Sequence, residues 1–276
     1  MTEKNEYLEQ LNKLQNYHDF ALDISEATAG KKNIPWHLVR GHQLFNRLNM
    51  TCLSAIRLMP YNRQFPTDRV FWDFFSIASL TRNFVENYYA LFYIAVDSIE
   101  SPEREFRLLL LTFHLNNEKY KFFNECDPSD PLLKDFETNL PIDKQKLQAH
   151  PFFKKLDKQK QNGVLKGVRA KYLSNDEIAK RIGHDTSEFK PLYRFFSNQV
   201  HSTPWAFYTQ SNIRGRGLEN EVELAYTTTA IQLITKYLMA AILDMTALFP
   251  ECLDLIDKRK LKTITADFKR FSTAEL

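Results

Sequence analysis

The chain has 276 residues, of which 43% are hydrophobic and 13% aromatic, so it can bury a substantial core and global disorder is excluded. Only 7 residues are glycine, which argues against glycine-rich β architectures. The net charge of +3 is too small to indicate nucleic-acid binding by itself.

The cysteines and the first residues of the chain indicate a cytoplasmic protein. Cys52, Cys126 and Cys252 lie far apart and form no Cys-x2-Cys pair, so neither a disulfide framework nor a zinc ribbon is predicted. The first residues are polar and charged, unlike a signal peptide. The most apolar stretch, residues 226–249, contains two charged residues and is predicted to be a core helix rather than a membrane span.

Helical periodicity dominates the chain, which predicts an all-α fold. Pro35 suits the first turn of the second helix, and Thr67 or Asp68 can cap the third. At the start of the fourth helix, Ser101 can cap the helix and Pro102 lies in its first turn. Helices are expected at residues 3–25, 35–59, 67–97, 101–125, 191–204, 219–248 and 251–271, and most of them are long.

The middle of the chain has a weaker pattern and is rich in lysine. Short helices are expected there at about residues 132–138, 142–161 and 174–183. We therefore predict one helical domain over residues 1–276, an antiparallel bundle of five or six long helices, with residues 127–190 as an insertion or mobile subregion.

A polar stripe on the helix near residue 200 is the first candidate site. Arg194, Ser197, Asn198 and His201 are spaced i, i+3, i+4 and i+7, which places them on one helical face. In a ribonuclease, His201 would move protons and Arg194 would hold the phosphate, with Ser197 and Asn198 orienting the imidazole or the substrate. The same residues could instead form a buried structural network.

A second polar group lies in the expected third helix, among aromatic residues. Arg82 and Glu86 are spaced i, i+4, as are Asn83 and Asn87. One interpretation is an Arg82–Glu86 ion pair that fixes helix packing. The other is that Arg82 or Glu86 reaches the polar stripe around His201 and completes a site.

Basic residues could supply an RNA-binding surface. Between Lys144 and Lys171 there are nine Lys or Arg against one acid. The candidate RNA contacts are Lys154, Lys155, Lys158, Arg214 and Arg216. The alternative is a solvated helix face with two turn arginines. The basic run at residues 258–262 is expected to be a solvated helix.

No motif for a cofactor or a metal is found. The sequence has neither a Walker A loop nor a Gly-x-Gly-x-x-Gly element, so no nucleotide phosphate cradle is predicted. His114 and Glu118 are spaced i, i+4 without further ligands nearby, so no metal site is expected.

The two polar motifs together resemble those of a group of bacterial all-helical proteins that carry Arg-x3-Glu (here Arg82 to Glu86) and Tyr-x3-Ser-x3-His (here Tyr193 to His201). The Arg194-x6-His201 element is also similar to the Arg-x4–6-His signature of the HEPN superfamily. That resemblance implies a helical bundle, often a homodimer, and in many members a ribonuclease of toxin–antitoxin, abortive-infection or CRISPR-associated defence systems. Other members are non-catalytic binding modules.

The resemblance implies that Arg194 and His201 are catalytic and that two copies face each other across a dimer interface. We therefore expect a metal-independent endoribonuclease of stress response or phage defence, with RNA and an antitoxin or other defence protein as partners. The alternative is a non-catalytic interaction or sensor protein in which Arg194 and His201 are structural.

Overall fold

The computed structural model describes residues 2–67, 70–183, 186–201, 203–207 and 217–273, without the side chains of residues 186–189 and 271–273. Across these residues the fold is all-α and contains no strand, which confirms the predicted fold class. The chain divides into two compact units. The first unit comprises Met1–Val96 and Ala179–Leu276, and the second comprises Asp97–Ile178.

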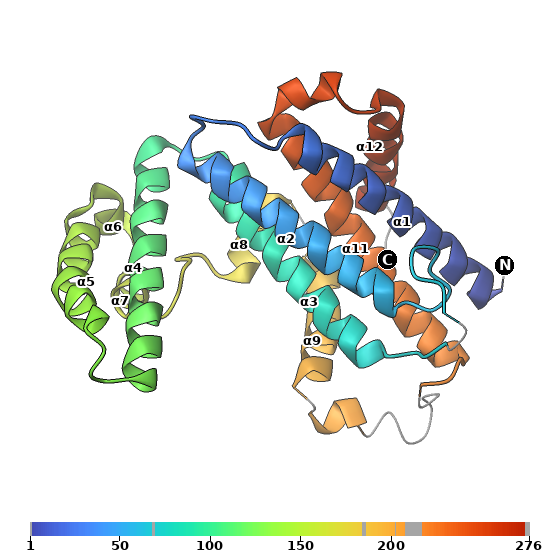
Figure 1. The fold of residues 1–276 in the computed structure, drawn as a ribbon, viewed down its shortest axis with the longest axis horizontal. Helices are drawn as coiled ribbons and strands as arrows, with labels where there is room; N and C mark the ends of the chain where they lie inside the picture. Colours follow the sequence, from blue (N-terminus) through green and yellow to red (C-terminus); the bar gives the residue numbers. More distant parts are fainter. Residues whose placement is uncertain (1, 68–69, 184–185, 202, 208–216, 274–276) are drawn as a thin grey trace. The chain divides into compact units, whose positions relative to one another are not determined.

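The first unit contains most of the long helices (Figure 1). Its elements are α1 (Glu3–Ala27), α2 (Trp36–Leu58), α3 (Phe74–Leu91), the π-helix η1 (Phe92–Val96), α9 (Thr186–Val200), α11 (Glu221–Leu248), the 3-10 helix η2 (Pro250–Asp254) and α12 (Lys258–Thr273). Helix α11 packs against α1, α3 and α12, while α3 also packs against α2 and α9. The core of this unit therefore surrounds α11 and α3.

Helix α11 is long and apolar enough to cross a membrane by length and composition alone. However, 67% of its most apolar window is buried inside the protein, as expected of a core helix. The Asn220 side chain caps the helix by accepting a hydrogen bond of 2.9 Å from the Glu223 N–H.

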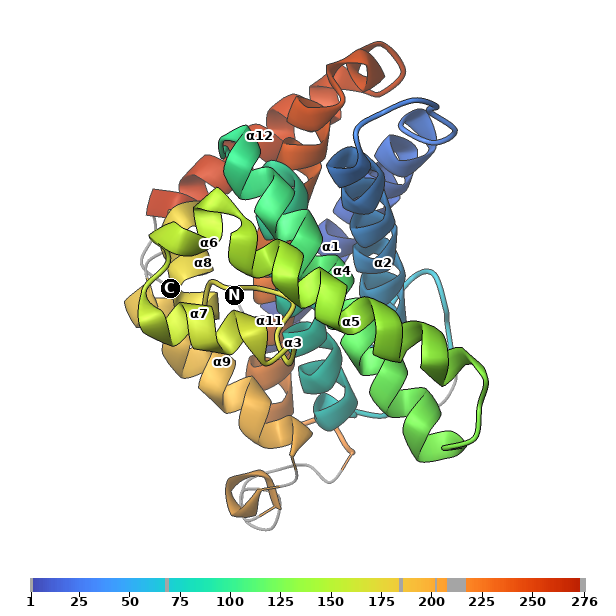
Figure 2. The same cartoon turned by 90° about the vertical axis from the view of Figure 1, so that its left-hand side faces the viewer.

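The second unit is built around α4 (Ser101–Cys126). Its other elements are α5 (Leu132–Ala149), α6 (Pro151–Lys155) and α7 (Lys158–Leu165), while α8 (Asn175–Ile182) begins in this unit and ends in the first. Helix α5 packs along α4 (Figure 2). Arg107 is buried, with 1% of its surface exposed, and forms ion pairs with Asp97 at 2.5 Å and with Glu103. The Phe106 ring packs on the rings of Phe152 and Tyr172.

The expected start of the third helix is wrong. Helix α3 begins at Phe74, and its cap is Asp73, whose side chain accepts a hydrogen bond from the Ser76 N–H at 3.1 Å. Just before the helix, the Trp72 N–H donates a hydrogen bond of 3.0 Å to the Gly217 carbonyl. Thr67 therefore caps no helix, and Asp68 lies outside the described residues.

Other predicted boundaries also differ from the structure. The helix expected at 142–161 is instead the end of α5 followed by two short helices, α6 and α7. Helix α5 continues through Pro141, since Leu133 and Leu147 on either side of it are both buried. Helix α9 begins before Pro191 and ends at Val200. The expected helix at 251–271 is two elements, η2 and α12, separated by a short break. Pro141 and Pro191 thus lie inside helices rather than at their ends.

Candidate functional site

Aromatic packing holds α9 against α3. The Phe74 ring lies 5.7 Å from the Phe195 ring and 6.1 Å from the Phe196 ring, measured between centroids. Phe196 is only 1% exposed. Phe195 also packs at 5.0 Å on Tyr226 of α11, so the residue that follows Arg194 has a packing role. This contact fixes which face of α9 lies on α3.

Four side chains from α3 and α9 then meet, and we call them the α3–α9 cluster: Arg82, Glu86, Tyr193 and His201. Within α3, Arg82 Nε donates to Glu86 Oε1 at 3.1 Å. The same Glu86 oxygen accepts a hydrogen bond from the Tyr193 hydroxyl. Arg82 Nη1 lies 3.1 Å from His201 Nε2, and the guanidinium carbon lies 5.6 Å from the centre of the Tyr193 ring. Arg82 and Glu86 of α3 therefore each contact a residue of α9.

The chemistry of Arg82 determines the protonation of His201 in this arrangement. A guanidinium has N–H donors and no acceptor, so His201 Nε2 must accept the hydrogen bond. The geometry therefore assigns the ring proton to Nδ1.

Charge and burial also act on the other two members of the cluster. The pKa of Tyr193 is raised because its hydroxyl is buried and donates to the Glu86 carboxylate, which outweighs the effect of Arg82. Burial alone would lower the pKa of Arg82, but the hydrogen bonds and charges of Tyr193 and Glu86 outweigh it and raise that pKa. Arg82 therefore stays a cation.

The cluster is open to solvent on one side. The side chains of Arg82 and Glu86 are 24% and 40% exposed, and His201 is an exposed residue. The arrangement joins a fixed cation, a carboxylate and a histidine, the groups used in metal-independent acid–base chemistry.

The expected polar stripe is only partly assembled. Arg194 is exposed, and within the described residues its guanidinium has neither an ion pair nor a hydrogen bond. Asn198 donates to the Arg194 carbonyl at 2.9 Å and accepts from the Thr203 hydroxyl at 3.0 Å, so it stabilises the end of α9. Ser197 is half-buried and has no side-chain hydrogen bond to any described residue. None of the three side chains forms a hydrogen bond with His201.

The candidate RNA-binding lysines lie in the second unit. Lys154 and Lys155 belong to α6 and Lys158 to α7, and all three are exposed. Arg214 and Arg216 lie outside the described residues. No group of three or more His, Cys, Asp or Glu side chains that could hold a metal is found among the residues searched, which are the described ones.

The sequence left two interpretations of Arg82 and Glu86 open, an ion pair within the helix or a reach to the polar stripe. The structure contains the ion pair and also places Arg82 beside His201, whereas Glu86 bonds to Tyr193 and to no residue of the stripe. Sequence reasoning missed the Tyr193 hydroxyl as a partner of Glu86. The available signal was the helical spacing of Tyr193, Ser197 and His201, which indicates a shared face. Spacing alone does not show which helix this face contacts.

A family of unknown function (DUF5677) matches residues 40–216, which is more than half of the chain, so the protein belongs to that family. The matched segment includes all four members of the α3–α9 cluster. No curated protein matches the chain, and no solved structure does either.

Proposed function

We propose that the protein is a HEPN-like, metal-independent endoribonuclease of stress response or phage defence, with His201 and Arg82 at its centre. The contact of 3.1 Å between Arg82 and His201 carries the proposal, because it joins a phosphate-binding cation to a group that can transfer protons. Glu86 and Tyr193 hold Arg82 in place. Arg194 is exposed and serves as a second phosphate contact.

The reaction follows from this placement. An incoming phosphate competes for the Arg82 donors and releases His201 Nε2. The freed nitrogen takes the proton of the ribose 2′-hydroxyl, and the 2′-oxygen attacks phosphorus. The bond from phosphorus to the 5′-oxygen breaks, the leaving oxygen takes a proton from the imidazolium or water, and a 2′,3′-cyclic phosphate remains. Arg82 and Arg194 stabilise the added negative charge.

In this proposal we take the long helices to form an antiparallel bundle of five or six, and the Lys-rich residues 127–190 to be an insertion that offers surface for RNA. Lys154, Lys155 and Lys158 would attract the phosphate backbone. The reaction would take place in the cytoplasm, in a homodimer, and an antitoxin or other defence protein would restrain it.

A test uses the full chain and end-labelled single-stranded RNA in EDTA. Wild type is expected to cleave, while His201→Ala and Arg82→Ala lose at least about a hundredfold in rate. Arg194→Ala is expected to lose less, since Arg194 does not contact His201. Arg47→Ala is the control, because Arg47 is exposed on α2. Equal cleavage by wild type, His201→Ala and Arg82→Ala would falsify the proposal.

A non-catalytic interaction or sensor protein is the second candidate. It is favoured by one observation: Arg82, Glu86 and Tyr193 satisfy one another without any ligand. In that case His201→Ala lowers the melting temperature and wild type leaves RNA intact. An unchanged melting temperature for His201→Ala would argue against this role.

A further inference from the structure

The first two helices of the chain carry opposite charge. Helix α1 has six acidic side chains against two lysines. Residues 27–67, which include all of α2, have six Lys or Arg and no acid. The whole chain has a net charge of only +3, so this separation is a local feature of the α1–α2 hairpin.

Hydrogen bonds fix which parts of α1 and α2 lie at the same level. The two helices lie side by side (Figure 1). Near the connecting loop, the His42 ring donates to the Ser25 carbonyl oxygen at 3.3 Å. Further from the loop, the His18 ring donates to the Asn49 carbonyl oxygen at 3.1 Å. The helices are therefore antiparallel, and the last turns of α1 lie beside the first turns of α2.

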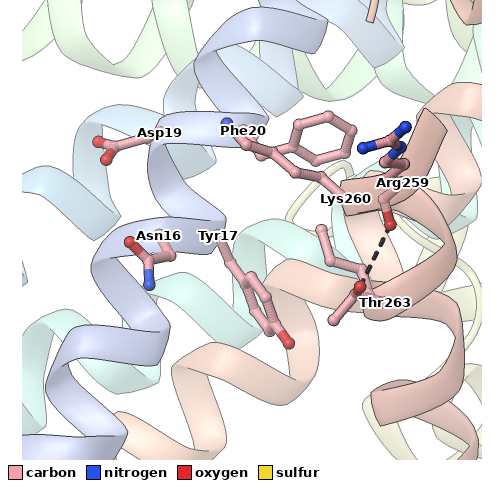
Figure 3. Close-up of a pocket in the computed structure, with 8 residues that line it drawn as sticks. Asn16, Tyr17, Asp19, Phe20, Arg259, Lys260 and Thr263 are labelled. Carbon is pink, nitrogen blue, oxygen red and sulfur yellow. Dashed lines mark hydrogen bonds between the residues drawn. The ribbon is translucent and has the colours of Figure 1, made fainter. Parts of the chain in front are cut away.

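An acidic stripe on α1 points away from α12. Figure 3 shows the pocket of about 370 Å³ between these helices, where Tyr17 and Phe20 point toward α12 and Asp19 points away from it. Asp23 and Glu26 follow Asp19 at i+4 and i+7, so the three acids share one face of α1. This face is not covered by α12.

The acids of this stripe differ in how far they are neutralised. Asp19 pairs with Arg63 at 2.6 Å, and Asp23 lies 4.0 Å from Lys260 in a pair whose two side chains are more than half exposed. Glu26 is exposed and has no ion pair within the described residues. Glu26 therefore offers an unpaired carboxylate at the loop end of the hairpin.

An unpaired cation lies on α2 near the same level. Arg40 is exposed, and its guanidinium donates to the Gln43 side-chain oxygen at 2.7 Å. In the part of the chain that the structure describes, Arg40 forms no ion pair, although Glu26 lies on the neighbouring helix. Both charges are thus available to another molecule.

Apolar side chains are exposed on the same two helices. Leu22 of α1 is 38% exposed, and Val39 and Met50 of α2 are 39% and 60% exposed. Leu22 lies one turn before Glu26, and Val39 precedes Arg40. The apolar and charged side chains therefore share one surface, which we call the α1–α2 face: Leu22, Glu26, Val39, Arg40 and Met50.

We propose that the α1–α2 face binds the same face of a second copy of the chain, with the two-fold axis along the seam between α1 and α2. Rotation about this axis places acidic α1 of each copy on basic α2 of the other. Glu26 of each copy then meets the partner's Arg40, and the exposed apolar side chains of both copies leave water together. An axis across the helices would instead oppose acid to acid.

The mixed charge of the surface favours a second copy over RNA, because the acids of α1 would repel phosphates lying along α2. The pairing uses no residue of the α3–α9 cluster. It therefore holds whether or not the protein cleaves RNA.

Sedimentation equilibrium of the full chain from about 1 to 100 μM tests the pairing. Wild type is expected to dimerise. Arg40→Glu and Glu26→Arg each create two like-charge contacts between copies and should weaken the dimer about tenfold or more. Met50→Lys, which puts a charge into the apolar part, should do the same. Circular dichroism establishes that each variant is folded.

An equimolar mixture of Arg40→Glu and Glu26→Arg gives the sharpest result. In a heterodimer of these two variants both contacts join opposite charges, so the mixture should dimerise about as tightly as wild type. The controls are Lys144→Glu and Glu137→Lys, the same charge changes at exposed positions of α5, which should each dimerise like wild type.

The proposal is overturned if wild type stays monomeric over the whole concentration range. It is also overturned if Arg40→Glu, Glu26→Arg or Met50→Lys dimerises like wild type, since another surface would then hold the copies together. Failure of the mixture to recover, or equal weakening by the α5 controls, would overturn it as well, because only general surface charge would then matter.

Discussion

The Tyr193 hydroxyl of α9 donates a hydrogen bond to the Glu86 carboxylate of α3, although the two residues are 107 positions apart. This bond fixes the carboxylate that in turn holds Arg82 beside His201. The order of contacts therefore runs from Tyr193 through Glu86 and Arg82 to His201. A change at Tyr193 should affect the histidine without touching it.

Tyr193→Phe tests that relationship. It removes the hydroxyl while the ring still packs beside Arg82, and Glu86 keeps its bond to Arg82. We expect a loss of about 1 kcal/mol in the free energy of unfolding, since Glu86 is partly exposed to water. Urea unfolding measures this loss of stability. An RNA cleavage assay should also give a rate below that of wild type. Tyr120→Phe, in α4, is the control and should change neither quantity.

Asp244 should make stability depend on pH. Burial in α11 raises the pKa of Asp244 to about 6, although the hydrogen bond of 2.9 Å from the Tyr88 hydroxyl opposes this. Between the ordinary carboxyl pKa and pH 6 the folded state holds a proton that the unfolded state has lost. Stability from this group is therefore fully present below about pH 4 and is lost as pH rises to about 6.

Asp244→Asn removes the loss of stability with rising pH, because the amide does not titrate, and its carbonyl oxygen can still accept the hydrogen bond from Tyr88. We expect the variant to exceed wild type by up to about 2–3 kcal/mol at pH 7 and by almost nothing at pH 4. Urea unfolding at both pH values measures the difference. Asp254→Asn, with a side chain 85% exposed, should show little change at either pH. A variant less stable than wild type at pH 7 would contradict the assignment.

Arg107 should be essential to the second unit. Its side chain is 1% exposed and pairs with Asp97 and Glu103, so Arg107→Ala leaves two carboxylates without their buried partner. The expected loss is about 3–5 kcal/mol. Hydrogen exchange followed by mass spectrometry should show faster exchange over residues 97–178. Arg169→Ala, at an exposed position of the same unit, should leave this exchange as in wild type.

Replacing each of two glycines by alanine should change the stability of the protein in opposite directions. A Cβ on Gly41 would lie 2.8 Å from the Ala95 Cβ, so Gly41→Ala should destabilise α2 against η1 by about 1–3 kcal/mol. A Cβ on Gly163 of α7 would meet nothing within 4 Å, so Gly163→Ala should stabilise by roughly 0.5–1 kcal/mol. Thermal melts of both variants measure the difference, and a Gly41→Ala protein as stable as wild type would show that α2 can move away.

Sequence patterning predicted the helices well wherever burial and capping agreed. Residues 3–25 and 101–125 were predicted within two residues of α1 and α4, because an amphipathic run ended there at clear polar breaks. The start of α3 was misplaced because Thr67 looks like a cap locally. The deciding contact, Trp72 with Gly217, joins segments that no local pattern connects.

The site was predictable only in part for the same reason. Periodicity identified Arg82, Glu86 and His201 as polar residues on helical faces. It could not show that His201 contacts the arginine of another helix rather than Arg194 of its own. That outcome depends on how Phe74 packs against Phe195 and Phe196, which is a long-range contact.

The first unit is assembled from chain segments that flank residues 97–178. During synthesis the ribosome makes α1, α2 and α3 long before α11, the helix against which α1 and α3 are buried. The apolar faces of these early helices therefore lack their packing partner α11 until the whole second unit has been synthesised. Arg82 and Glu86 likewise wait for Tyr193 and His201, so a nascent chain cannot carry a complete α3–α9 cluster until most of the protein has left the ribosome.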